Sequence, residues 1–286
     1  MSTRGLLKAR ARSAASAGLS AWRASAPSAS TDRVDPVLAA ARAAADERLL
    51  QKPVFILSSI RSGSTLLRVM LNSHSQIYAP HELHLTGIKV NMSSKYVKSA
   101  MQELGLSAET LQFLLWDRLL QRELMRNNKQ LLVNKTPSDA LMWRRIIRCW
   151  PDVRFIYLLR HPAAVTDSWQ RARQDWTRDE VGEDVKRYMV AVEEARSQRG
   201  GLTVKYEDVT TDPEREMRRI CKFIGVAYEP AMVDYGRADH GSFRAGLGDW
   251  SKNIKSGKIV PVERMPTPDE IPATLLDLTK QWGYLS

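Results

Sequence analysis

The sequence has few cysteines and no long apolar run. Cys149 and Cys221 are the two cysteines among 286 residues, and neither has the spacing of a metal ligand. We therefore expect buried free thiols rather than a disulfide framework or a zinc site. A membrane-spanning helix needs roughly 20 consecutive apolar residues. The sequence contains no such window, so we expect no membrane span and a cytoplasmic location.

Acidic side chains are outnumbered by basic ones. The chain has 32 Asp and Glu against 43 Lys and Arg, which gives a formal net charge of +11. Such an excess fits nucleic acid, an anionic membrane surface or a small polyanionic ligand, and charge alone does not choose among them. The basic residues are spread along the chain and match no nucleic-acid recognition motif, so we expect no nucleic-acid partner.

The first segment of the chain lacks acids altogether. Residues 1–31 are rich in Ala, Ser and Arg, and the first acidic residue is Asp32. This composition resembles an organelle transit peptide or a basic surface helix, and it equally fits a disordered leader. We expect a basic leader over residues 1–50, partly disordered or helical, followed by a single domain over residues 51–286.

Short apolar runs alternate with helical patterns along the predicted domain. The runs occupy residues 53–58, 131–134, 153–159 and 202–206. Buried strands separated by helices of ten or more residues predict an α/β fold of three layers, with a mainly parallel central sheet and helices on both faces. Ligands of such sheets bind at the carboxyl ends of the strands. Residues 239–264 are expected to form a long loop before a closing helix.

A loop rich in Ser and Gly follows the first apolar run. Residues 58–65 leave the expected strand and open the expected helix, a position where backbone N–H groups and the helix dipole bind anions. Gly63 permits close approach of the backbone to a ligand, and Arg61 supplies a cation with bidentate reach. Hydroxyl donors come from Ser62, Ser64 and Thr65.

This loop lacks the lysine of an ordinary nucleoside-triphosphatase loop. The pattern G-x-x-x-x-G-K-[ST] is not met, and the run at 153–159 leads into Arg160, where such an enzyme often places a metal-holding Asp. We therefore expect a phosphate-bearing donor that is handled without a required metal. A turn that merely caps a helix is the alternative for the Ser and Thr residues.

Over about residues 53–261 the chain resembles the sulfotransferase superfamily. The segment Arg61–His74 is similar to the 5′-phosphosulfate loop and following helix of tyrosylprotein sulfotransferases and of sulfotransferase domains in modular polyketide synthases. The resemblance implies a fold like that of P-loop nucleotide hydrolases. It also implies that 3′-phosphoadenosine-5′-phosphosulfate (PAPS) is the cosubstrate, with its 5′ side held by residues 61–65.

The resemblance further implies a site for the donor's 3′-phosphate. In the superfamily an Arg that ends a central strand and a Ser eight residues later bind this group, and Arg160 and Ser168 keep that spacing. Tyr206 corresponds to a tyrosine that lies against the adenine, with a tyrosine of the core as the alternative. Arg244 and Lys252 fall in or beside a segment that resembles the loop closing over the nucleotide.

The resemblance also assigns catalytic roles. Lys135 resembles the active-site lysine, which with Arg61 would stabilise the sulfuryl oxygens and the leaving phosphate. Glu82 falls where tyrosylprotein enzymes have their general base, and His84 is the second candidate because cytosolic enzymes use a His. If this segment is extended, Glu82 and His84 share one face and His81 points away.

Two other functions remain open from the sequence. A P-loop nucleotide kinase or hydrolase would share the strand-loop-helix pattern, and a non-catalytic module would bind phosphorylated nucleotides without transfer. For the acceptor we expect a small molecule, a carbohydrate or a natural product, bound by the variable stretches 86–126 and 171–187. Candidates for stacking on it are Trp116, Trp169 and Trp176.

Overall fold

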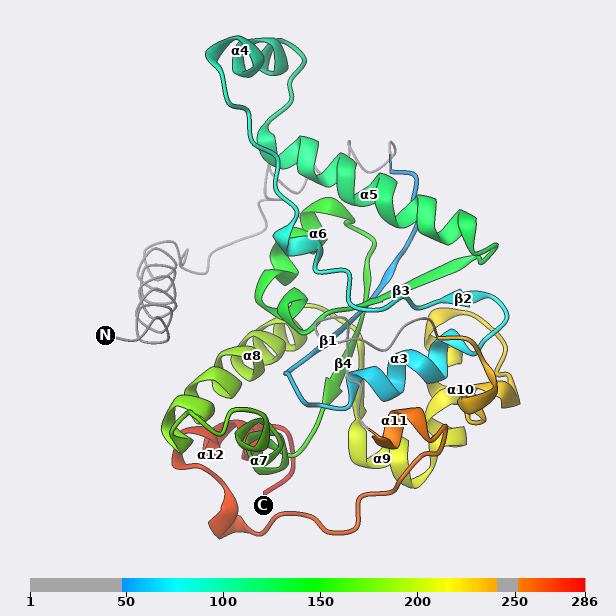
Figure 1. Cartoon of the computed structure of the whole chain (residues 1–286), viewed down its shortest axis with the longest axis vertical. Helices are drawn as coiled ribbons and strands as arrows, with labels where there is room; N and C mark the ends of the chain where they lie inside the picture. Colours follow the sequence, from blue (N-terminus) through cyan, green and yellow to red (C-terminus); the bar gives the residue numbers. More distant parts are fainter. Residues whose placement is uncertain (1–47, 241–251, 286) are drawn as a thin grey trace. The chain divides into compact units, whose positions relative to one another are not determined.

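The computed structural model describes residues 48–240 and 252–285 (Figure 1). Its strands are β1 (Val54–Ser58), β2 (Ile77–Tyr78), β3 (Leu131–Lys135), β4 (Arg154–Leu159) and β5 (Leu202–Lys205). They form one sheet in the order β2-β3-β1-β4-β5, and every neighbouring pair is parallel. In this sheet β3 and β4 lie on opposite sides of β1. The carboxyl end of β1 is therefore a topological switch point, the place where parallel sheets bind their ligands.

Helices cover both faces of this sheet. They are α3 (Ser64–Asn72), α4 (Lys95–Glu103), α5 (Ala108–Arg126), α6 (Trp143–Cys149), α7 (Pro162–Ala172), α8 (Arg178–Gln198), α9 (Tyr206–Thr211), α10 (Pro213–Ile224), α11 (Lys252–Lys255) and α12 (Leu276–Gln281). Short 3₁₀ turns join several of them, including Pro137–Met142 after β3. In Figure 1, α4 projects away from the sheet at the end of the α4–α5 pair.

Two apolar cores arise from the alternation of side chains along the strands. On β1, Val54 and Ile56 face one core, which includes the apolar sides of α3 and α10. Phe55 and Leu57 face the other core, which includes α5, α6 and α8. Because both faces are covered, every residue of β1 is buried, and the run carries no polar alternation. The predicted three-layer α/β class is confirmed.

The predicted strands match the observed ones to within a residue or two at their ends. β3 extends one residue further than predicted and includes Lys135, whereas β5 stops at Lys205 and Tyr206 begins α9. β2 was not predicted, because its two residues are too short to show a pattern. Cys149 and Cys221 are buried free thiols, as predicted.

The remaining sequence expectations concern the ends and the long loop. The predicted leader lies outside the described residues except for residues 48–50, of which Leu50 already packs in the core. The part of the predicted loop that the structure describes contains the short helix α11. Within the described ranges, no helix combines the length and the apolar character needed to cross a bilayer.

Candidate active site

A cavity of about 1110 Å³ opens at the carboxyl ends of the central strands. The chain enters it just after β1, after β4 and after β5, where Arg61, Arg160 and Tyr206 stand. A second wall, called the outer wall below, comes from the end of α7 and from residues 258 and 260–264. Other residues that line the cavity are Gly63, Ser64, Thr65, Glu82, Pro137, Ser168, Trp169, Arg171, Ala172, Arg173, Tyr235 and Ile254.

The loop after β1 is shaped as an anion cradle. Gly63 occupies the N-cap of α3 with φ of 82°, and no side chain caps the helix. The first N–H groups of α3 are therefore not used by a capping side chain, which argues against the capping alternative for this loop. Arg61 also has a positive φ, of 60°. Among the described residues, the buried hydroxyls of Ser58 and Ser59 find no hydrogen-bond partner.

Gly63 is required for a second reason. A Cβ built on it would lie 2.1 Å from Cδ2 of Tyr206, far inside van der Waals contact. The ring of Tyr206 thus packs directly on the loop backbone, and the guanidinium of Arg160 lies 4.4 Å from the ring centroid. Tyr206 is a half-buried residue that lines the cavity and also packs against the apolar core on the α3 side of the sheet.

Arg160 directly follows β4 and Ser168 lies on α7, and both contact Arg61 of the loop after β1. Nη1 of Arg160 donates to the carbonyl of Arg61 at 2.9 Å, and Nε of Arg61 donates to Oγ of Ser168 at 3.1 Å. Ser168 comes two turns after Pro162 begins α7, as its spacing predicted. Two guanidinium groups and a hydroxyl therefore stand together at one end of the cavity.

Lys135 and Glu82 form a buried ion pair beside the loop. Nζ of Lys135 lies 2.5 Å from Oε1 of Glu82 and donates to Oγ1 of Thr65 at 3.3 Å. The Lys135 side chain is 1% exposed and that of Glu82 is 15% exposed. An ammonium group that is this buried needs a paired anion, and Glu82 supplies it. The loop, a cation and a carboxylate thus lie within hydrogen-bonding reach of one another.

His84 stands outside this pair. Its Nε2 lies 3.7 Å from Oε2 of Glu82, so the two side chains are neighbours, although the extended backbone assumed for this segment is not observed at His84. However, the backbone of His84 is left-handed with φ of 47°, and its side chain is 49% exposed and does not line the cavity. Of the two base candidates, Glu82 is the one that faces the cavity.

A second carboxyl group lies behind the ion pair. Asp139 is fully buried and accepts a hydrogen bond from Nδ2 of Asn134 at 2.7 Å. Burial raises the pKa of Asp139 to about 8, and the charge of Glu82 adds to this effect, whereas Asn134 and Lys135 oppose it. At neutral pH Asp139 is therefore largely protonated, and Glu82 is the carboxylate that pairs with Lys135.

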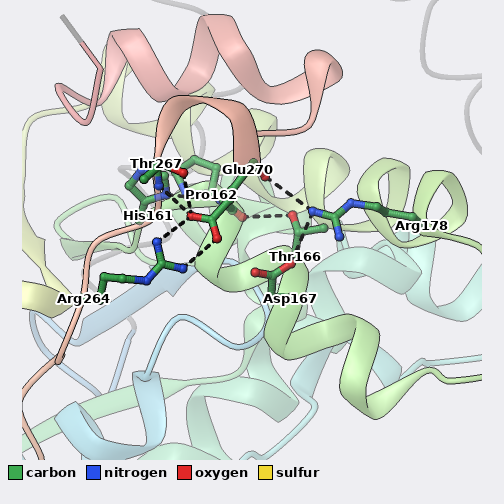
Figure 2. A network of polar contacts seen from close by, with 9 residues as sticks. His161, Pro162, Thr166, Asp167, Arg178, Arg264, Thr267 and Glu270 are labelled. Carbon is green, nitrogen blue, oxygen red and sulfur yellow. Dashed lines mark hydrogen bonds and ion pairs between the residues drawn. The ribbon is translucent and has the colours of Figure 1, made fainter.

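The outer wall of the cavity is held by ionic contacts (Figure 2). Arg264 pairs with Glu270 at 2.6 Å, and this pairing lowers the pKa of Glu270 to about 2. Arg178 joins the wall to α7, because it lies 3.4 Å from Oδ1 of Asp167 and donates to the carbonyl of Glu270 at 3.4 Å. Figure 2 shows these side chains converging beside the first turns of α7.

The predicted aromatic and acceptor residues divide between wall and core. Trp169 lines the cavity, with the guanidinium of Arg173 4.2 Å from its ring centroid. Trp116 is buried in the core, and Trp176 packs on Arg173 outside the cavity. Of the two predicted acceptor stretches, only 171–187 contributes residues that line the cavity.

Some residues that line the cavity were not predicted from the sequence, and one predicted site residue lies outside the residues that the structure describes. Arg244 is outside the described residues, and Lys252 is described only as the first residue of α11. Residues 258–264 were expected to belong to a long loop, but no pattern indicated that they line the cavity, because loops have no period. Within the described residues, no group of three or more His, Cys, Asp or Glu is arranged to hold a metal ion.

Known proteins share this sequence pattern and this fold. The family model described as "Sulfotransferase family" matches residues 53–230. The chain is 24% identical to the protein-tyrosine sulfotransferase of Drosophila melanogaster over 199 residues, which are 64% of this chain and 40% of that protein. Protein-tyrosine sulfotransferase A of Caenorhabditis elegans is 22% identical over 198 residues, 64% of this chain and 52% of that protein. The chain thus matches about half the length of these curated relatives.

Two solved structures resemble the chain over nearly their whole length. The sulfotransferase domain from the curacin biosynthetic pathway is 27% identical with a TM-score of 0.62, and the match covers 83% of this chain and 99% of that one. The sulfotransferase domain from the Synechococcus PCC 7002 olefin synthase is 27% identical with a TM-score of 0.61, covering 84% and 100%.

These comparisons correct one prediction. A cytoplasmic location was expected because the sequence has no long apolar run. That expectation is wrong, since the curated relatives that the chain matches are protein-tyrosine sulfotransferases. The reasoning failed because an apolar run reports on a span within the chain and not on the compartment.

Proposed function

The chain belongs to the sulfotransferase family, and on this premise we propose that it transfers the sulfuryl group of PAPS to a hydroxyl group of an acceptor. One observation carries the proposal. Nζ of Lys135 lies between Oγ1 of Thr65 on the phosphate loop and Oε1 of Glu82, so an anion-binding loop, a cation and a base adjoin at one point of the cavity. That combination is what transfer from an anionic donor to a hydroxyl requires.

The residues fit a donor that carries phosphate at both ends of its nucleoside. The loop at residues 61–65 would hold the 5′-phosphosulfate on the backbone N–H groups of the start of α3. Arg160 and Ser168 would hold the 3′-phosphate, for which a planar guanidinium and a hydroxyl are suitable donors. The ring of Tyr206, between Gly63 and Arg160, offers a face for the adenine.

The chemistry follows from this arrangement. The acceptor oxygen attacks sulfur as the bond between sulfur and the bridging phosphate oxygen breaks, and the acceptor proton passes to Glu82. By analogy with phosphoryl transfer, charge gathers on the sulfuryl oxygens and on the departing phosphate. Lys135 and Arg61 neutralise that charge, and their fixed positions mean that little reorganisation is needed during the reaction. We expect no metal to be required.

For the acceptor we propose a hydroxyl of a small molecule or natural product. The solved sulfotransferase domains that match over 99% and 100% of their length come from a biosynthetic pathway and an olefin synthase, at 27% identity. The protein-tyrosine sulfotransferases match at 24% and 22% and over about half their length. A tyrosine in a peptide is the second candidate, supported by those relatives.

The experiment is a screen of acceptors with ³⁵S-labelled PAPS, paired with calorimetry of adenosine 3′,5′-bisphosphate. We expect bisphosphate binding without added metal, and label transfer to hydroxylated small molecules rather than to tyrosine peptides. Transfer to peptides alone would reassign the acceptor. Bisphosphate binding with no transfer to any acceptor would favour a non-catalytic module, and magnesium-dependent turnover of nucleoside triphosphates would favour a kinase or hydrolase.

A further inference from the structure

The segment after α12 contacts the proposed 3′-phosphate site from behind. The hydroxyl of Tyr284 donates to Oε2 of Glu207 at 2.6 Å. The other oxygen of the same carboxylate, Oε1, accepts the backbone N–H of His161 at 2.9 Å. Glu207 directly follows Tyr206, and His161 directly follows Arg160. One carboxylate thus ties together the two turns that present Arg160 and Tyr206 to the cavity.

The ring of Tyr284 reinforces this tie. The ring meets the imidazole of His161 edge to face, with 5.1 Å between the two ring centroids. The ammonium of Lys205 lies 4.3 Å from the centroid of the Tyr284 ring. Nζ of Lys205 also donates to the carbonyl of Gly283 at 3.2 Å. Lys205 directly precedes Tyr206, and His161 directly follows Arg160, so Tyr284 contacts the chain neighbours of both residues.

Protonation states are compatible with this arrangement. Burial lowers the pKa of His161, and its Nδ1 accepts the N–H of Ala163 at 3.3 Å, which requires an unprotonated nitrogen. Burial and then the charge of Glu207 raise the pKa of Tyr284, so its hydroxyl keeps the proton that it donates. The contact is a neutral donor on a carboxylate, and hydrogen bonds to charged groups are the stronger kind.

We propose that Tyr284, acting through Glu207, is a positioning residue for the donor's 3′-phosphate. The proposal rests on the proposed function, because it assigns Arg160 to that phosphate. Tyr284 touches neither the cavity nor the loop at residues 61–65, and it lies beyond the residues 53–230 that the family model matches. Its contribution is to hold Arg160 over Tyr206 in the geometry that receives the phosphate.

The test uses the full chain with Tyr284→Phe, which removes the hydroxyl and keeps the ring. We expect the Kd for adenosine 3′,5′-bisphosphate to rise about three- to tenfold, from the loss of one charge-assisted hydrogen bond that organises the site. The KM for PAPS should rise in parallel, while kcat at saturating donor changes by less than about twofold. Tyr228→Phe is the matched control, because Tyr228 packs on Arg218 of α10 outside the cavity.

A double-mutant cycle separates positioning from a general loss of stability. If Tyr284 acts through Arg160, then adding Tyr284→Phe to Arg160→Ala should leave the Kd for the bisphosphate unchanged. An equal loss in both backgrounds would overturn the proposal, as would an unaltered Kd in folded Tyr284→Phe. Failure of the wild-type chain to bind the bisphosphate would instead overturn the proposed function, and this inference with it.

Discussion

The cavity has an inner wall and an outer wall that are built differently. The inner wall, at residues 61–65, Arg160 and Tyr206, consists of turns that directly follow parallel strands, with the buried Lys135 beneath it. The outer wall is the end of α7 and residues 258–264, an irregular segment in which Val260 is 45% exposed, against 1% for Lys135. The inner wall is fixed by the sheet, whereas the outer wall is fixed by a few surface contacts.

Under the proposed function, we expect donor chemistry at the inner wall and acceptor choice at the outer wall. The hydrogen-bonded sheet holds residues at its strand ends in fixed positions. Such residues suit a donor whose charge must be neutralised at defined points. A loop wall tolerates changes of length and sequence, which suits a site that varies between acceptors. The predictions below test this division, from the largest expected effect to the smallest.

Among the variants that compare the two walls, Lys135→Met should cause the largest loss. It removes the cation between Thr65 and Glu82, and kcat should fall about 10²- to 10³-fold in steady-state transfer assays. Lys258→Met is the matched control, since Lys258 lines the outer wall of the same cavity. Equal losses in the two variants would contradict the division between the walls.

Gly63→Ala should mainly weaken donor binding. The new Cβ would meet the Tyr206 ring at 2.1 Å in a backbone with φ of 82°, so the loop must shift. We expect the Kd for adenosine 3′,5′-bisphosphate to rise about tenfold or more. Gly200→Ala is the control, because a Cβ there meets nothing within 4 Å. Calorimetry showing unchanged affinity would mean that the loop backbone does not hold the donor.

Asp139→Asn should change the pH dependence of stability. The folded pKa of Asp139, about 8, lies above its ordinary value of 3.8, so the folded state binds this proton more tightly than the unfolded state. Stability from this group is therefore present below about pH 4 and is lost as pH rises toward 8. Asn cannot ionise and should keep the contact with Asn134.

The measurement is urea unfolding of wild type and Asp139→Asn at pH 5 and pH 8. From pH 5 to pH 8, the free energy of unfolding of the variant should rise by about 1–3 kcal/mol relative to that of wild type. This is less than the full pKa difference would give, because the surroundings of a buried group relax when it ionises. A difference that does not change with pH would show that Asp139 is ionised in the folded protein at both values.

Arg264→Gln should have the smallest effect. It breaks the pair with Glu270 at the outer wall, where Arg264 is exposed and Glu270 is partly exposed, so solvent screens the pair. The KM for PAPS should rise less than about fivefold and kcat should hardly change. Arg237→Gln, which breaks the exposed pair with Asp234, is the control. A loss as large as that of Lys135→Met would make the outer wall part of the catalytic machinery.

The inner wall was largely predictable because its residues obey local rules. The loop at residues 61–65 follows an apolar run, and Ser168 lies about two turns after Pro162 begins α7, whereas the pairing of Arg160 with Ser168 came from the resemblance. The ion pair of Lys135 with Glu82 was not predicted as such, since residues 53 apart meet only through the sheet. Asp139, Glu207 and Tyr284 carry no motif, and their contacts emerge only from tertiary packing. The compartment was predicted wrongly, because composition does not encode it.

The base at Glu82 is the central claim, and one measurement tests it most directly. Transfer of ³⁵S from PAPS to the best acceptor of the screen is compared for wild type, Glu82→Gln and Glu263→Gln, a second glutamate that lines the same cavity. We predict that Glu82→Gln loses about 10²- to 10⁴-fold in kcat while its calorimetric affinity for adenosine 3′,5′-bisphosphate is retained, and that Glu263→Gln keeps both. Wild-type turnover in Glu82→Gln would contradict the account.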